Sequence, residues 1–177
     1  MEDRRDLDAP RHRLYDTINE TGCLTWLLLT KRPQNFSKFL PSWRPSNIWG
    51  LTTVESPEYL WRIDSLKSSG LETLGLSIEP LLADIPKIGE HLDGISWVLV
   101  GGESGAGARP MTPDWARRIR DECLSRGIAF HFKQWGEWGP FGQASVGHSN
   151  ALIKIGKKKA GHLLDGEEWL QFPKVGA

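Results

Sequence analysis

Five short apolar runs alternate with helix-like segments along this chain, and this alternation limits the folds that it can adopt. The runs begin near residues 24, 47, 74, 95 and 128, and the predicted helices cover 9–20, 33–40, 57–69 and 112–126. Strands separated by helices at this interval predict a parallel sheet with right-handed crossovers. We therefore expect an α/β fold: a partial (βα) barrel, or an open parallel sheet of about five strands, with the helices outside and without the N-terminal units of a full barrel.

Local sequence patterns give more detailed predictions for two of these elements. The run Leu24–Leu29 is almost continuously apolar, which predicts a strand buried on both faces. Thr112 precedes Pro113 at the start of the segment 112–126, so we expect Thr112 to cap that helix.

The strand–helix pattern stops near residue 136. We expect residues 1–136 to form the partial barrel and residues 137–177 to form an irregular C-terminal extension packed on it. Lys+Arg and Asp+Glu are both 22, so the net charge of zero gives no sign of strong overall steering toward nucleic acid. No apolar run is long enough to cross a bilayer, and the charged first residues lack a signal-peptide pattern, so we expect no membrane association.

Cys23 and Cys123 are the two cysteines, a hundred residues apart. This spacing offers no local zinc or iron–sulfur ligand set, so we expect no metal site in this chain alone. Two free thiols suit a reducing compartment, and we expect a cytoplasmic protein.

Polar residues follow each predicted strand. Because the carboxyl ends of parallel strands meet at one edge, we expect these residues to share a ligand-binding rim. The rim candidates are Lys31, Arg32, Thr53, Glu55, Glu79, Gly101, Gly102, Glu103, Ser104, Arg109, Lys133, Gln134 and Trp135.

The glycine-rich stretch 101–107 admits two interpretations. It has the glycine spacing of a phosphate loop, but Ala108 and Arg109 replace the Lys-Ser/Thr pair, and the dinucleotide fingerprint also fails. Backbone N–H groups together with Arg109 could hold a carboxylate or phosphate. Alternatively, the glycines serve only the geometry of a tight turn.

The charged rim residues also leave alternatives open. Glu55, Glu79 and Glu103 could bind a metal or an ammonium group or perform acid–base chemistry. They could equally be neutralised by lysine and arginine on the same rim. The basic residues Lys154 and 157–159 could contact nucleic acid or form a solvated tail. His131 lies within a predicted strand and is interpreted as a core histidine whose hydrogen bonds are satisfied.

Several ordered motifs resemble one known family. They are Trp26-Leu-Leu-Leu-Thr-Lys-Arg-Pro33, Ile48-Trp-Gly-Leu-Thr-Thr-Val-Glu55, Leu76-Ser-Ile-Glu-Pro-Leu-Leu82, Trp97-Val-Leu-Val-Gly-Gly-Glu-Ser-Gly105, Ala108-Arg-Pro-Met111, Phe132-Lys-Gln-Trp-Gly136 and Leu163-Leu-Asp-Gly-Glu-Glu-Trp169. The chain resembles, over residues 5–173, an uncharacterised phage and prophage family with a three-cysteine motif, related to radical S-adenosylmethionine (SAM) enzymes.

The resemblance implies the C-terminal two-thirds of such a protein, with the chain truncated relative to a full member. Family members carry a cysteine triplet near their N-terminus, which this chain lacks. SAM and a [4Fe–4S] cluster are therefore expected only if a missing N-terminal segment or a separate partner protein completes the site, and the chain alone is expected to be inactive. The Gly-Gly-Glu at 101–103 resembles a SAM-contacting motif, but it follows a late strand, so that role is not transferred. The charged rim suits a polar or nucleic-acid-derived substrate; the alternative is a non-enzymatic module that binds an anion or nucleic acid.

Overall fold

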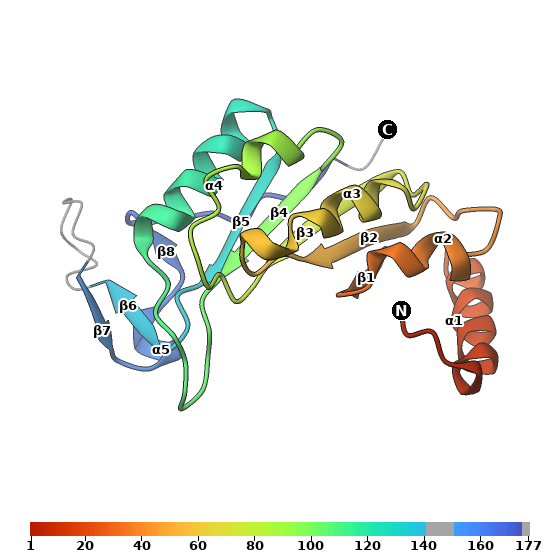
Figure 1. Ribbon diagram of the computed structural model, residues 1–177, viewed down its shortest axis with the longest axis horizontal. Coiled ribbons are helices and arrows are strands. Elements are labelled where there is room, and N and C mark those ends of the chain that lie inside the picture. Colours follow the sequence, from red (N-terminus) through yellow and green to blue (C-terminus); the bar gives the residue numbers. More distant parts are fainter. Residues whose placement is uncertain (141–150, 175–177) are drawn as a thin grey trace.

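A computed structural model of the chain describes residues 1–140 and 151–174. Parallel strands and helices occupy most of the chain, and short hairpins follow them near the C-terminus (Figure 1). The elements are η1 (Arg5–Leu7), α1 (Asp8–Glu20), β1 (Trp26–Thr30), η2 (Pro33–Asn35), α2 (Phe36–Phe39), β2 (Ile48–Thr53), η3 (Pro57–Tyr59), α3 (Trp61–Lys67), β3 (Thr73–Ile78), η4 (Ile88–His91), β4 (Trp97–Gly101), α4 (Pro113–Ser125), β5 (Ala129–Gln134), β6 (Trp138–Pro140), β7 (Leu152–Lys154), α5 (Lys157–Ala160), β8 (Leu163–Leu164) and β9 (Glu167–Glu168).

The central sheet confirms the predicted α/β fold. Its five strands are all parallel and follow the order β1-β2-β3-β4-β5, so that each strand pairs with its neighbour in sequence. When every crossover steps in the same direction with the same hand, the helices come to lie on one face. This strand order is compatible with either an open sheet or part of a barrel.

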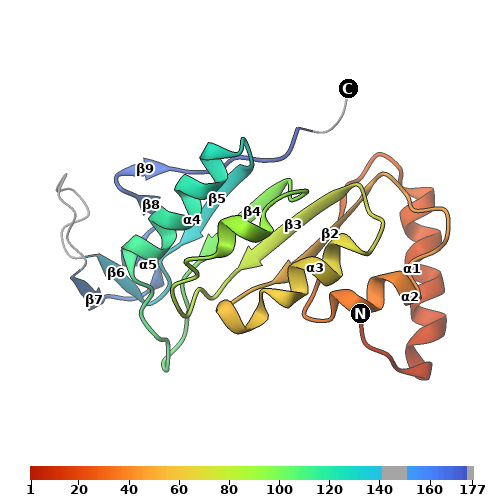
Figure 2. The same cartoon turned by 45° about the horizontal axis from the view of Figure 1, so that its top comes forward.

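One face of the sheet holds the main core. Ile48, Leu76 and Phe130 alternate inward from three strands, and Ile63 of α3 and Ile119 of α4 pack onto the same cluster. Figure 2 shows α3 and α4 lying across this side of the strands. Burying these side chains together is the dominant favourable term in folding the sheet.

The opposite face is only thinly covered. Trp49, Leu51 and Trp97 form a small separate cluster there, in register across β2, β3 and β4. On β1, the side chains of Leu27 and Leu29 are 50% and 53% exposed. The prediction that this strand is buried on both faces is therefore wrong, because no described element packs over its second face.

Helix α4 begins where the sequence predicts, but its start is not capped as expected. Pro113 occupies the first turn, and the Thr112 side chain makes no capping hydrogen bond within the described residues. Proline at the first turn removes one backbone N–H that would otherwise need a partner. Cys123 is buried on the inner side of this helix, where desolvation raises the pKa of its thiol to about 12, whereas Cys23 is exposed.

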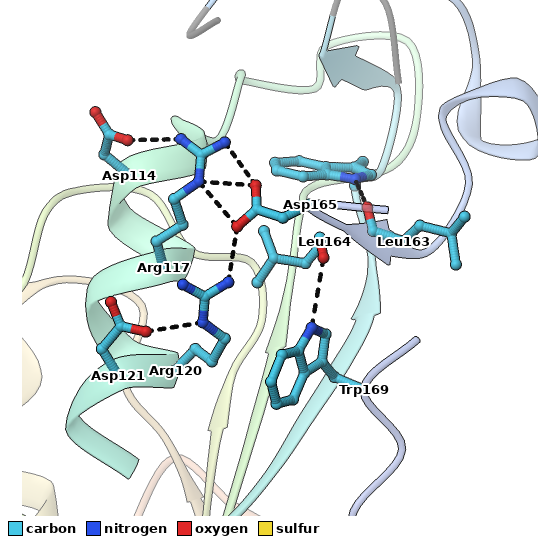
Figure 3. A network of polar contacts seen from close by, with 9 residues as sticks. Asp114, Arg117, Arg120, Asp121, Leu163, Leu164, Asp165 and Trp169 are labelled. Atoms are coloured by element: carbon cyan, nitrogen blue, oxygen red, sulfur yellow. Dashed lines mark hydrogen bonds and ion pairs between the residues drawn. The ribbon is translucent and has the colours of Figure 1, made fainter. Parts of the chain in front are cut away.

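The region after β5 contains short regular elements. β6 pairs with β7, α5 follows, and β8 and β9 form a hairpin whose turn includes Asp165, at a φ of 57°. The Asp165 carboxylate accepts hydrogen bonds from Arg117 and Arg120 of α4 (Figure 3). These bonds fix the hairpin against the helix. Among the described residues, no helix is long and apolar enough to span a membrane.

Candidate functional site

The strand ends place most of the predicted rim residues at one edge of the sheet, but in three separate groups. The first group lies at the ends of β3, β4 and β5. Glu79 accepts hydrogen bonds from Lys133 Nζ at 3.0 Å and from Gln134 Nε2 at 2.9 Å. Gln134 Nε2 also donates to the carbonyl of Gly102 at 3.0 Å, so one amide ties three strand ends together.

Glycine is required at this junction. A Cβ on Gly102 would lie 1.9 Å from the carbonyl oxygen of Trp135, and one on Gly136 would lie 2.1 Å from the carbonyl oxygen of Glu103. The segments that leave β4 and β5 therefore approach each other at backbone distance. For Gly102, the observed packing fits the interpretation of a tight turn.

The second group surrounds Glu55, which is only 4% exposed at the end of β2. Its carboxylate pairs with Lys31 from β1 and with Arg62 Nη1 at 2.9 Å from α3. Burial is the largest single influence on Glu55 and raises the pKa of its carboxyl, but the hydrogen bond from Lys31, a backbone hydrogen bond and the charges of Lys31 and Arg62 together outweigh it, so the pKa is lowered. Arg62 also donates to the carbonyl and the hydroxyl of Thr53, both at 3.1 Å.

Sequence reasoning missed Arg62. Arg62 lies in the first turn of α3, between the apolar residues Tyr59 of η3 and Leu66 of α3, and its guanidinium stacks over the Tyr59 ring at 4.0 Å. A buried charged side chain needs a partner of opposite charge. An arginine among the apolar positions of this helix could therefore have predicted an ion pair with a nearby carboxylate.

The third group is the loop after β4. Arg109 forms a two-pronged ion pair with Glu103, with Nε and Nη2 each 2.8 Å from a carboxylate oxygen, and its backbone N–H donates to the same group. These hydrogen bonds lower the pKa of Glu103 to about 2. Ser104 is exposed on the same loop.

Elements after β5 support this loop from outside. The Gly105 N–H donates to Glu137 at 3.2 Å, Trp138 Nε1 donates to the carbonyl of Ala108 at 2.8 Å, and Lys154 Nζ donates to the carbonyl of Ala106 at 2.5 Å. Glu137 and the paired strands β6 and β7 thus hold the glycine-rich loop in place.

Two other rim candidates are committed to internal contacts. Trp135 is 2% exposed, stacks edge-on against Phe132 and donates from Nε1 to the carbonyl of Leu163. Arg32 forms an ion pair with Glu2 near the N-terminus. None of these contacts connects Trp135 or Arg32 with the groups around Glu79, Glu55 and Glu103.

The three rim carboxylates each have their own cationic partner: Lys31 and Arg62 for Glu55, Lys133 for Glu79, and Arg109 for Glu103. Over residues 1–140 and 151–174, no group of three or more His, Cys, Asp or Glu side chains is arranged to hold a metal ion. This pairing matches the ion-pair alternative for the rim carboxylates.

His131 is not the satisfied core histidine that its sequence position suggests. Its ring contacts the rings of Trp97 and Phe172 edge-on, with centroid distances of 6.0 and 5.6 Å. Its Nδ1 is buried without a hydrogen-bond partner in the described part of the chain. Burial, assisted by Lys133, lowers the pKa of this imidazole and favours the neutral ring.

A surface cavity of about 540 Å³ adjoins the first group. Its lining includes two rim candidates and residues of the C-terminal region: Lys133, Gln134, Lys157, Lys158, Gly161 and His162. The lysines of the predicted solvated tail are therefore placed on the short helix α5 beside the rim.

Comparison with known proteins identifies a family. A family profile described as "Protein of unknown function (DUF5131)" matches residues 5–173. The chain belongs to the DUF5131 family. No curated protein and no solved structure matches it. The DUF5131 match spans β1 to β9, so both the sheet and the C-terminal hairpins are family features.

Proposed function

We propose that this DUF5131 chain forms the substrate-side part of a radical-SAM-like (βα) barrel of phage or prophage origin and is catalytically incomplete by itself. The observation that carries the proposal is the sheet: five sequential parallel strands with α3 and α4 on one face and a thinly covered second face. In a (βα) barrel, helices lie outside and the second face lines the interior.

The rim supports the same proposal. In barrels of this type the ligand binds at the carboxyl ends of the strands, where Glu55, Glu79 and Glu103 lie here in ion pairs. On the second face, Gly75 of β3 stands in register between Leu51 and Trp97, and Ser77 stands between Thr53 and Leu99.

The residues of this chain do not fit a [4Fe–4S] cluster. The family-type cluster needs three cysteine thiolates, and this chain has an exposed Cys23 and a buried Cys123 whose thiol pKa is raised to about 12. The cluster and SAM would therefore have to be held by a further segment or partner protein that bears the three-cysteine motif. The two free thiols are consistent with a cytoplasmic location.

The proposal is tested by iron content under anaerobic conditions. The chain expressed alone should contain no iron, whereas the chain joined to, or co-expressed with, a segment that carries the cysteine motif should copurify with iron and show cluster absorbance. If the extended protein contained neither iron nor cluster absorbance, the radical-SAM part of the proposal would be wrong. Replacing the motif cysteines with serine is the matched control.

A second candidate is a non-enzymatic module that binds an anion or nucleic acid. The observation that favours it is the lysine-lined cavity next to Gln134, which needs no iron or SAM to bind a ligand. Binding and iron content can be measured separately, so the two candidates are distinguishable.

A further inference from the structure

The outer edge of β1 lacks the features that keep a strand edge from pairing with another chain. Residues 21–30 contain no charged residue, and β1 contains no proline and pairs with β2 without a bulge. Charged residues, proline and bulges are the usual protection of a strand edge, and a covering segment is another. No strand lies beside the outer edge of β1 within the described residues.

The backbone of β1 shows which residues face outward at this edge. The Trp26 N–H donates to the Asn47 carbonyl at 2.8 Å, in the direction of β2. Backbone groups of successive residues point to opposite sides of a strand. Leu28 therefore also faces β2, whereas Leu27 and Leu29 direct their N–H and C=O groups outward. In the part of the chain that the structure describes, no hydrogen bond uses these outward groups.

The side chains along the same edge are apolar on both faces of the sheet. Leu27 and Leu29 are 50% and 53% exposed on the second face. On the first face, Trp26 and Leu28 are half-buried against the main core. An edge with free backbone groups and apolar side chains on both sides is suited to pairing with another apolar strand.

We propose that the chain forms a two-fold dimer in which β1 pairs in the antiparallel direction with β1 of a second copy. A two-fold axis uses the same surface twice, so the edge must be complementary to itself. With Leu28 opposite Leu28 of the second copy, all five residues of β1 are paired, and each Leu27 lies opposite Leu29 of the other copy. Because both leucines direct their backbone groups outward, each such pair exchanges two hydrogen bonds.

The charges that follow β1 fit this antiparallel register. Lys31 would lie opposite Thr25 of the second copy, so like charges do not meet. Arg32 would lie opposite Leu24. Both cations already have a carboxylate partner within their own chain. A parallel pairing in register would instead place Lys31 beside Lys31 of the second copy, which is destabilising.

The size of this interface sets the strength of the dimer. Stable interfaces contain about 20–30 residues on each side, whereas β1 has five residues. We therefore expect a weak dimer that forms at micromolar protein concentrations and above. The inference goes beyond the proposed function and requires neither iron nor SAM. In the proposed barrel an added strand would use the same edge, and such a strand would displace the second copy.

Sedimentation velocity of the full chain over a concentration series tests for the dimer. The chain should shift from monomer to dimer as its concentration rises. Leu29→Lys should weaken association by roughly tenfold or more, because it places a charge beside Leu27 of the second copy. Leu124→Lys is the matched control: Leu124 is 43% exposed on α4, and the same change there should leave association unchanged. When dilute, both variants should unfold at the temperature of the unmodified chain, because both side chains are exposed.

Disulfide formation tests the register. In a Cys23→Ser background, a mixture of Leu27→Cys and Leu29→Cys chains should form a disulfide between the two variants, because the Cα atoms of opposed residues lie about 5.5 Å apart. Either variant alone should form few disulfides, since its two cysteines would lie diagonally, about 7–8 Å apart. Cys123 is buried and does not react in this assay.

Three results of the sedimentation experiment would overturn the proposal: a monomer at every concentration, a dimer that Leu29→Lys leaves intact, or equal losses in the two lysine variants. Disulfides that form as fast in either cysteine variant alone as in the mixture would overturn it as well. The iron content of the extended protein is a separate measurement, so failure here is distinguishable from failure of the barrel proposal.

Discussion

The two edge strands of the sheet differ in whether another segment of the chain covers their outer edges. The outer edge of β5 is paired by the chain's own C-terminal segment: the Phe132 N–H donates to the Trp169 carbonyl at 2.9 Å, and Gln171 exchanges hydrogen bonds with Phe130 through its N–H and Oε1. The outer edge of β1 has no strand beside it within the described residues, and Leu29 is 53% exposed on the uncovered face of this strand.

This difference indicates where the sheet would be extended. Exposed apolar strand edges invite pairing with another strand, and proteins normally cover or charge them. β5 is covered by its own chain, so in the proposed barrel any additional strand would pair with β1.

The largest expected effect comes from a matched pair of leucine substitutions. Leu164→Ala, at a fully buried position of the β8–β9 hairpin, should lower the free energy of unfolding by about 2–5 kcal/mol. Leu29→Ala, on the uncovered side of β1, should change it by about 0.5 kcal/mol or less. Urea denaturation of both variants measures the difference.

If both substitutions lowered the free energy of unfolding equally, the contrast between a buried Leu164 and an exposed Leu29 would be wrong, because Leu29 would then be buried in solution. Repeating the measurement over a range of protein concentrations separates burial by a second copy, which depends on concentration, from burial within one chain.

An intermediate effect is expected at Asp165, which joins the closed edge to α4. Asp165→Asn should lower the free energy of unfolding by about 1–2 kcal/mol near neutral pH, because Arg117 and Arg120 lose a charged acceptor that is itself partly exposed. The hydrogen bond from Arg117, with help from Arg120, lowers the pKa of this carboxyl below its ordinary value of 3.8.

The sign of the pH dependence follows from that shift. A carboxyl whose pKa is lower in the folded state stabilises the fold above its unfolded pKa and loses the contribution as pH falls through the folded one. The difference between the wild-type chain and Asp165→Asn should therefore be full above about pH 4 and shrink below it. Chemical denaturation at several pH values checks this, and a difference that stayed constant down to pH 3 would exclude an ionised Asp165 as its cause.

The smallest effect on stability is expected at the exposed Glu103–Arg109 pair of the rim, where solvent screens the charges. Its signature is the titration: the Glu103 carboxyl should titrate at a pKa of about 2, and Arg109→Gln should return it toward the ordinary range near 4.5. Carboxyl carbon shifts in an NMR pH titration measure both. An unchanged pKa in Arg109→Gln would show that the pair is not formed in solution.

The strand pattern was largely predictable, whereas the partners of the rim residues were not. The runs near residues 47, 74 and 128 correspond to β2, β3 and β5, because apolar runs between turn residues report burial directly. The sequence offered Glu55 and Lys31 as separate rim residues, but the pairing with Arg62 needs α3 to cross back over the end of β2.

One prediction about burial failed. Leu24–Leu29 reads as a strand buried on both faces, whereas Leu27 and Leu29 are exposed. Hydrophobicity and charge along the chain do not reveal which distant element lies over a given face. That nothing described covers Leu29, and that Ala160 anchors the lysines of α5 beside Gln134, depend on contacts between residues far apart in sequence.

The sequence by itself therefore determined the α/β class and the strand–helix order, since these follow from local periodicity and from the parallel direction of the strands. Only the tertiary structure decided that the rim carboxylates are neutralised in pairs and that one sheet edge is paired by the chain's own C-terminal segment whereas the other has no strand beside it within the described residues. The physical reason is that ion pairing, edge covering and cavity formation are set by distances between side chains, which no local pattern encodes.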